Sequence, residues 1–139
     1  MKAFLISGDR SGSGKTSITL AIAAALAKRW TVQTFKVGMD YIDPSYLTGV
    51  TGRLCRNLDS FVMSQDEIYA VFKHACIGAD IAIIEGVRGL YEGAESTDDI
   101  GSTASIAKLL QIPIILVIDA RSITRSAAAL LYGFMKFDP

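Results

Sequence analysis

The segment GDRSGSGKT at residues 8–16 has the residue types of a phosphate-binding loop. In such a loop, glycines let backbone N–H groups point at a phosphate, a lysine neutralises the terminal phosphates and a Ser or Thr hydroxyl binds Mg²⁺. The usual spacing G-x-x-x-x-G-K-[ST] places glycine at position 9, where this chain has Asp9, with Gly8 one residue early. We predict that a nucleotide binds through Ser11, Gly12, Ser13, Gly14, Lys15, Thr16 and Ser17.

The elements on either side of this loop favour a nucleotide site over the alternative, a Gly/Ser-rich turn with a solvated lysine. Residues 2–7 form an apolar run typical of a strand, and residues 16–27 carry alanine, leucine and isoleucine at helical spacing. A strand, a glycine-rich turn and a helix are the context that a phosphate-binding loop requires.

Two acidic residues are candidate ligands for a metal ion beside Thr16. Glu85 follows the apolar run Ile81–Ile84, which we expect to end there, and the carboxyl ends of parallel strands face the crevice beside a phosphate-binding loop. A carboxylate at that place can hold Mg²⁺ directly or through water. Asp59 follows a short apolar-polar run and is a third candidate; for both acids the alternative is a solvated side chain.

The segment FKVGMDYIDPSY combines charged and aromatic side chains over a short stretch. Its candidate residues are Lys36, Asp40, Tyr41, Asp43 and Tyr46. Two carboxylates, a cation and two aromatic rings can bind and orient a substrate. We expect residues 38–49 to form an irregular functional loop, and the alternative is an Asp-Pro turn with solvated acids. For Arg88 and Tyr91 the same two alternatives remain, a substrate-binding role or a place in a solvated turn. An Arg beside a γ-phosphate can stabilise transferring charge.

Strand and helix signals alternate along the whole chain. The predicted strands are residues 2–7, 32–37, 81–84 and 112–118, and the predicted helices are residues 16–27, a helix capped by Ser64 and Glu67, 102–110 and 124–134. Apolar runs without alternation indicate a parallel sheet covered on both faces. We therefore predict a doubly wound α/β fold.

Composition excludes several classes of protein. The 139 residues are half apolar, enough for one globular domain, and 14 basic residues balance 14 acidic ones, so no overall field favours nucleic acid or an anionic membrane as a partner. Two cysteines without metal-ligand spacing indicate a reducing, cytoplasmic compartment. No run approaches the roughly 18 apolar residues of a membrane span. The chain ends without a closing strand, so we expect a fragment of a longer protein.

Six segments together resemble the ATP-dependent a,c-diamide synthases of tetrapyrrole biosynthesis, which act on cobyrinate or on nickel sirohydrochlorin. They are SGDRSGSGKT, FKVGMDYIDPSY, RNLDSF, EGVRGLYEG, DDIGSTASIAKLL and DARSITRSAAAL. The resemblance implies a P-loop NTPase fold like that of dethiobiotin synthetase, with a mostly parallel sheet sandwiched by helices, and a truncated domain. By this resemblance we expect residues 1–139 to be the N-terminal portion of the ATP-binding amidoligase domain, without the family's C-terminal glutamine amidotransferase domain.

The resemblance also implies the reaction and the roles of residues. A macrocycle carboxylate attacks the γ-phosphate of Mg–ATP, and ammonia from glutamine then displaces phosphate to leave an amide. The implied catalytic residues are Lys15, Lys36, Asp40 and Asp43. The implied substrate-binding residues are Tyr41, Asp43, Tyr46, Arg88, Gly89, Leu90 and Tyr91, and the implied metal ligands are Thr16, Asp59 and Glu85. The implied partners are a tetrapyrrole substrate, the missing glutaminase domain and a second copy in a homodimer.

Three other classes share parts of the pattern. ParA/MinD-type ATPase switches carry a second lysine near the start of the loop, where this chain has Ser11. A GTPase is disfavoured because the chain has no N-K-x-D motif. Dethiobiotin synthetase shares the phosphate chemistry, but the D-Y-I-D-P and G-V-R-G-L-Y segments favour the diamide synthases. Met39 and Arg88 lean mildly towards the nickel sirohydrochlorin branch and leave the substrate open.

Overall fold

The chain folds around one parallel β-sheet. The computed structural model describes residues 1–94 and 99–138, so Asp98, the first residue of the DDIGSTASIAKLL segment, lies outside the described residues. The elements are β1 (Lys2–Gly8), α1 (Lys15–Ala27), β2 (Val32–Val37), α2 (Ile42–Thr51), β3 (Arg56–Leu58), α3 (Gln65–Ala75), β4 (Ile81–Gly89), α4 (Thr103–Leu110), β5 (Ile114–Val117) and α5 (Ser126–Phe137). In the described part of the chain, five strands pair in the order β3-β2-β4-β1-β5, and every pair is parallel.

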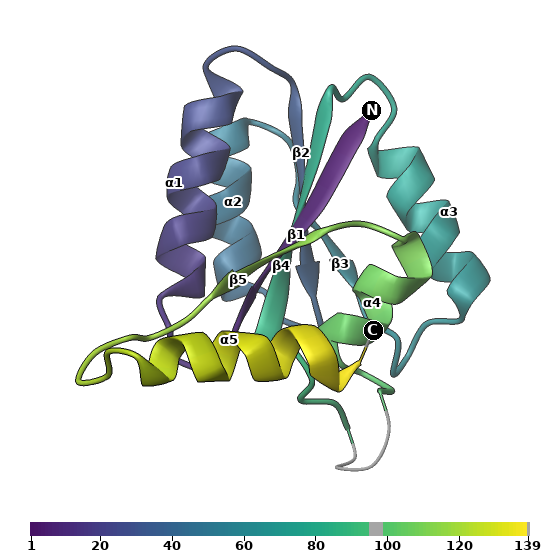
Figure 1. Cartoon of the computed structure of the whole chain (residues 1–139). Coiled ribbons are helices and arrows are strands. Elements are labelled where there is room, and N and C mark those ends of the chain that lie inside the picture. The colour runs from purple at the N-terminus through teal and green to yellow at the C-terminus, as the bar shows by residue number, and fades with distance from the viewer. Residues whose placement is uncertain (95–98, 139) are drawn as a thin grey trace.

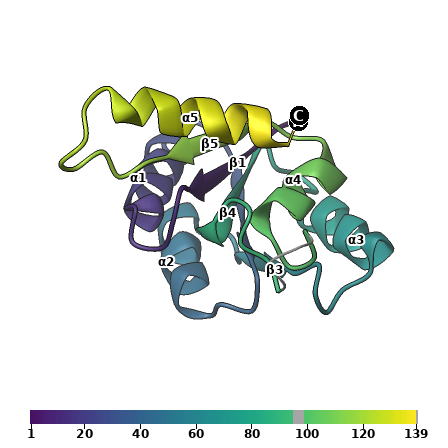
Figure 2. The same cartoon turned by 60° about the horizontal axis from the view of Figure 1, so that its bottom comes forward.

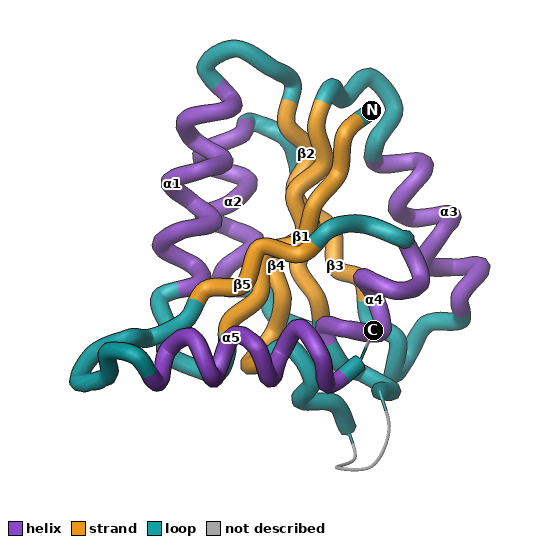
Figure 3. Tube along the Cα trace, viewed as in Figure 1, coloured by secondary structure: helices purple, strands orange, loops and turns teal. Residues whose placement is uncertain are grey.

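Helices cover both faces of the sheet. Figure 1 shows α1 and α2 on one face and α3 and α4 on the other, and Figure 2 shows α5 alongside the edge strand β5. Successive side chains of a strand point to opposite faces, so Leu5 and Ile6 enter different apolar clusters. On β4, Ile84 packs in the same cluster as Leu5, and Ile83 packs in the same cluster as Ile6. The predicted α/β sandwich is therefore confirmed, with the strands and the covering helices visible in Figure 3.

The prediction of an irregular loop over residues 38–49 was wrong beyond the first few residues, because α2 occupies Ile42–Thr51. Asp40 Oδ1 accepts a hydrogen bond of 2.8 Å from the first helical N–H, that of Ile42. Pro44 lies in the first turn, where its missing N–H costs nothing. Gly52 ends the helix in the left-handed conformation. The Asp-Pro pair thus begins a helix and does not form a turn.

Strand β4 continues past the point where it was expected to end. The apolar run Ile81–Ile84 was expected to end at Glu85, whereas the observed strand runs to Gly89. Glu85 is consequently an interior strand residue, with Ile6 and Lys36 as its partners in register on the neighbouring strands. The predicted end at Glu85 was wrong because Gly86 and Gly89 belong to the same strand.

The remaining boundaries differ by a few residues at most. The predicted strand 112–118 is shorter, at Ile114–Val117, and the predicted helix 124–134 is shifted to Ser126–Phe137. The capping box at α3 is confirmed, because Ser64 and Glu67 exchange hydrogen bonds. Among the described residues, no helix has the length and apolar character needed to cross a membrane.

Candidate nucleotide-binding site

The GDRSGSGKT loop connects β1 to α1 and depends on two left-handed glycines. Gly12 has φ +79° and Gly14, which immediately precedes α1, has φ +88°. Residues with a Cβ rarely adopt such φ angles, so the loop needs glycine at both positions. The first turn of α1 contains no acidic residue, which leaves the positive end of the helix available to an anion.

The displaced glycine, Gly8, is required by close packing inside the loop. A Cβ at this position would lie 2.3 Å from Ser13 Oγ and 2.9 Å from the carbonyl oxygen of Arg10. The next residue, Asp9, donates its backbone N–H to Val117 O at 3.0 Å and thereby attaches the loop to the end of β5. The shift of glycine from position 9 to position 8 is therefore part of the loop's own geometry.

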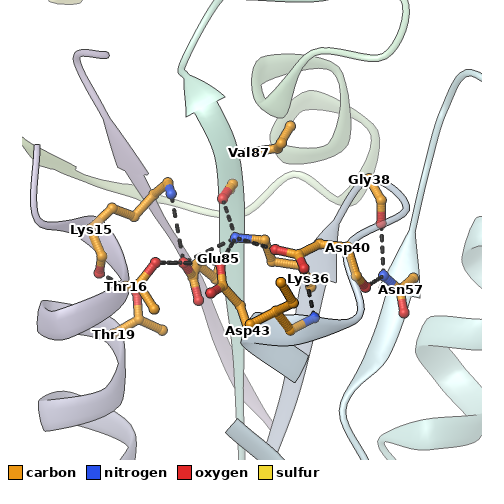
Figure 4. A network of polar contacts seen from close by, with 12 residues as sticks. Lys15, Thr16, Thr19, Lys36, Gly38, Asp40, Asp43, Asn57, Glu85 and Val87 are labelled. Carbon is orange, nitrogen blue, oxygen red and sulfur yellow. Dashed lines mark hydrogen bonds and ion pairs between the residues drawn. The ribbon is translucent and has the colours of Figure 1, made fainter. Parts of the chain in front are cut away.

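Lys36 is the centre of a buried group of polar side chains beside the loop (Figure 4). Its Nζ donates to Asp43 Oδ2 at 2.7 Å, to Glu85 Oε1 at 3.0 Å and to the carbonyl oxygen of Gly86 at 3.2 Å. Asp40 Oδ2 lies 3.7 Å away. Lys36 is only 2% exposed, so these oxygens replace the water that an ammonium group would otherwise bind.

Glu85 receives contacts from three donors on a single oxygen. Thr16 Oγ1 lies 2.6 Å from Glu85 Oε1, Lys36 Nζ lies at 3.0 Å and Lys15 Nζ at 3.6 Å. Glu85 is fully buried, and its other oxygen, Oε2, has no hydrogen-bond partner among the described residues. A buried carboxylate oxygen without a partner is costly unless a ligand or ion completes it.

The donor set at this place suits Mg²⁺. Thr16 Oγ1 lies 3.4 Å from Asp43 Oδ2 and close to Glu85, so one hydroxyl and two carboxylates meet. These are hard oxygen ligands, and Mg²⁺ is usually bound by one or two carboxylates together with water and substrate phosphates. Within residues 1–94 and 99–138, no three His, Cys, Asp or Glu side chains form a complete metal cage. The arrangement fits a metal ion that arrives with phosphate oxygens.

Burial and neighbouring charges shift the pKa values of this group in opposite directions. Burial lowers the pKa of Lys15, Lys36 adds to that effect, and the nearby carboxylates only partly offset it. Burial would also lower the pKa of Lys36, but Glu85 and Asp43 outweigh it and the net pKa is raised. Burial would raise the pKa of Asp43, whereas its hydrogen bond from Lys36 holds the net pKa below the ordinary value. Asp43 and Lys36 therefore favour their charged forms.

Asn57 fixes the segment that carries Asp40, and the sequence analysis did not include it among the site residues. Its Nδ2 donates to the carbonyl oxygens of Gly38 and Asp40, both at 2.7 Å. Asn57 lies on β3 in register with Lys36 of β2, so it holds the turn that follows β2. Its place in the RNLDSF segment, two residues before the candidate Asp59, was the only signal in the sequence.

Asp59 and the two tyrosines lie apart from the Glu85 contacts. Asp59 Oδ1 accepts a hydrogen bond from Phe61 N at 2.9 Å, and Asp59 lines a separate hollow of about 250 Å³ together with Gly38 and Arg88. Tyr41, which immediately precedes α2, and Tyr46, inside the helix, are both exposed. The roles predicted for these residues remain predictions.

Residues 88–91 follow Glu85 in the chain, but each of them has different surroundings. Arg88 is exposed, has φ +48° and donates to Gly93 O at 3.1 Å. Gly89 N donates to Glu92 Oε2 at 3.0 Å, and Leu90 is buried. Tyr91 stacks on Phe134 of α5, with ring centroids 5.7 Å apart, and donates its hydroxyl to the carbonyl oxygen of the same residue. Of these four residues, Arg88 is the one with an exposed, charged side chain.

The chain matches the family described as CbiA, the CobQ/CobB/MinD/ParA nucleotide-binding domain, over residues 4–137. It is 62% identical to a cobyrinate a,c-diamide synthase of Methanosarcina acetivorans, over 97% of this chain and 28% of that protein. It is 54% identical to the cobyrinate a,c-diamide synthase of Methanocaldococcus jannaschii, over 99% of this chain and 31% of that protein. The chain thus spans less than a third of the length of these curated relatives. With a family match that covers nearly all of its residues, the chain belongs to the CbiA family of nucleotide-binding domains.

Proposed function

We propose that the protein carrying this chain amidates the a- and c-side-chain carboxylates of a tetrapyrrole, using Mg–ATP and an acyl-phosphate intermediate. The nitrogen comes from glutamine or ammonia. The observation that carries this proposal is the meeting of Lys15, Thr16, Lys36, Asp43 and Glu85 beside the phosphate-binding loop. The names of the curated relatives support cobyrinate as the first substrate to test, with nickel sirohydrochlorin second.

The reaction needs charge neutralisation and alignment more than covalent help from the protein. In the first step, a substrate carboxylate oxygen forms a bond to the γ-phosphorus, and the bond between that phosphorus and the β–γ bridging oxygen breaks to release ADP. In the second step, ammonia nitrogen attacks the acyl carbon, phosphate leaves with the C–O bonding electrons, and the nitrogen loses a proton to give the amide. Each step moves negative charge onto phosphate oxygens.

The residues of this chain supply cations and acceptors where that charge develops. Lys15, at the start of α1, is positioned to neutralise the terminal phosphates. Lys36 is held beside Asp43 and Glu85, so its ammonium can orient the transferred phosphoryl group or the substrate carboxylate. When bound, Mg²⁺ would be held by Thr16 and Glu85, with Asp43 or Asp59, and would neutralise phosphate charge.

Substrate dependence of ATP hydrolysis tests the proposal. The whole protein is assayed with ammonia and, in parallel, cobyrinic acid, nickel sirohydrochlorin or diaminopelargonate. We expect ADP release only with a tetrapyrrole, together with the matching amide product in the mass spectrum. Stimulation by diaminopelargonate alone would instead support a dethiobiotin synthetase-like enzyme. Equal turnover without any of the three, raised by DNA or membranes, would support a ParA/MinD-type switch and contradict the amidation proposal.

A further inference from the structure

Lys36 and a metal ion bound beside Thr16 would contact the same two carboxylate groups, those of Asp43 and Glu85. Lys36 Nζ lies 3.0 Å from Glu85 Oε1 and 2.7 Å from Asp43 Oδ2. Those two oxygens are also the ones closest to Thr16 Oγ1, at 2.6 Å and 3.4 Å. A divalent cation bound by Thr16 and Glu85 would therefore meet the ammonium group at very short range, where two positive charges repel each other.

We infer that Lys36 competes with the divalent cation for the carboxylates of Asp43 and Glu85 and thereby keeps the affinity for the free metal ion low. The inference rests on the proposed Mg–nucleotide site and assigns Lys36 a role in making metal binding depend on the nucleotide. Lys36 acts here as a positioning and selectivity residue.

The charge balance around Glu85 supports this role. Lys15 and Lys36 face three carboxylates, those of Glu85, Asp43 and Asp40, so the two ammonium groups already offset all but one of the negative charges. Adding Mg²⁺ alone would leave an excess of positive charge in a largely buried place. Adding Mg²⁺ with a nucleotide brings phosphate charges that compensate for it. The site should consequently bind the metal ion well only as its nucleotide complex.

Lys36 also has acceptors that a metal ion at Thr16 and Glu85 would leave available. The carbonyl oxygen of Gly86 lies 3.2 Å from Nζ, and Asp40 Oδ2 lies 3.7 Å away. Asn57 holds the backbone of Asp40 in place. Lys36 can therefore give up Glu85 Oε1 while its ammonium remains bonded within the protein, so exchange of the two cations does not leave a buried charge without a partner.

Binding of Mn²⁺, measured by the paramagnetic resonance signal of the free ion, tests the inference on the full chain. The variants are Lys36→Met, which removes the charge, Lys36→Arg, which keeps it, and Lys28→Met, a matched loss of an exposed lysine on the far end of α1. Without nucleotide, we expect Lys36→Met to bind Mn²⁺ about tenfold more tightly than the wild type. Lys36→Arg and Lys28→Met should bind as weakly as the wild type. Equal Mn²⁺ affinity of Lys36→Met and the wild type would overturn the inference.

Two further measurements separate this inference from the proposed function and from misfolding. A non-hydrolysable ATP analogue should raise the Mn²⁺ affinity of the wild type much more than that of Lys36→Met. Failure of the wild type to bind Mn²⁺ with the analogue would contradict the nucleotide site itself, whereas normal binding with an unchanged Lys36→Met would contradict only the competition. If circular dichroism shows that Lys36→Met is unfolded, Lys36→Gln provides the same comparison because it keeps a hydrogen-bond donor for Asp43.

Discussion

Lys36 and Glu85 are partners in register on the neighbouring parallel strands β2 and β4, although 49 residues separate them in the chain. Their side chains point to the same face of the sheet, and Nζ lies 3.0 Å from Oε1. Residues paired in register on adjacent strands share a face because the side-chain period of a strand is two. The sheet itself, more than any loop, therefore sets the distance between this cation and this carboxylate.

The pair gives two helices a common point of contact. Thr16 reaches Glu85 from the first turn of α1, and Asp43 reaches Lys36 from the first turn of α2. Both helices lie on the same face of the sheet, as Figure 1 shows. A nucleotide bound at the start of α1 would therefore lie close to the first turn of α2. The resemblance places substrate-binding residues in that turn.

Replacing Lys15 should abolish nucleotide binding without unfolding the chain. Lys15 Nζ lies 3.6 Å from Glu85 Oε1, and burial lowers the pKa of its ammonium group, so we expect its loss to cost the fold little. Its charge should matter for the phosphates, and we expect Lys15→Ala to weaken binding of a fluorescent ATP analogue at least ~100-fold, the scale of a lost charge-assisted contact. Lys28→Ala is the control. Retained affinity in Lys15→Ala, with an unchanged melting temperature, would mean that the nucleotide binds elsewhere.

Asp43 should make the stability of the chain fall in acid. Its folded pKa is lowered below the ordinary Asp value of about 3.9, so its contribution is complete above that pH and is lost as the pH falls through the folded pKa. Urea unfolding between about pH 5 and about pH 2.5 should therefore show a steeper loss of unfolding free energy for the wild type than for Asp43→Asn. In the Lys36→Met background the difference should shrink, because Lys36 lowers that pKa. If the difference between Asp43 and Asp43→Asn were as large in the Lys36→Met background, groups other than Lys36 would have to lower the pKa of Asp43.

The sequence predicted the local chemistry of the site better than its long-range geometry. Lys15 and Thr16 follow from a contiguous motif, because their positions depend on one turn and the first residues of one helix. The contact between Lys36 and Glu85 depends on strand order and register, which are set by packing across the sheet and leave no local pattern. The start of α2 was misread because Asp-Pro favours a turn and the first turn of a helix equally well.

The exposed side chains of α5 predict self-association. The structure records no buried residue on this helix, and Tyr132, Met135 and Phe137 are 64%, 73% and 75% exposed. Apolar groups gathered in this way gain free energy when a second surface covers them. Sedimentation should therefore show a concentration-dependent dimer that Met135→Glu weakens, while Ile77→Glu, at a similarly exposed residue after α3, has no effect. A monomer at all concentrations would contradict self-association of this chain through α5.

Replacing Gly8 should destabilise the loop through steric overlap. In Gly8→Ala, the new Cβ would lie 2.3 Å from Ser13 Oγ and 2.9 Å from Arg10 O, and the second contact is with backbone. We expect a loss of about 1–3 kcal/mol of unfolding free energy and weaker nucleotide binding. Adding Ser13→Ala should restore only part of the loss, because the overlap with Arg10 O remains.

Gly49→Ala is the matched control for this overlap. Gly49 lies inside α2, and a Cβ there would meet no atom within 4 Å. Alanine costs less backbone entropy than glycine in a helix, so the same substitution should raise the unfolding free energy by about 0.5–1 kcal/mol. Urea titrations of both variants compare the same chemical change in opposite surroundings. If Gly8→Ala were as stable as Gly49→Ala and bound nucleotide normally, the loop would have to relax freely, and its early glycine would need another explanation.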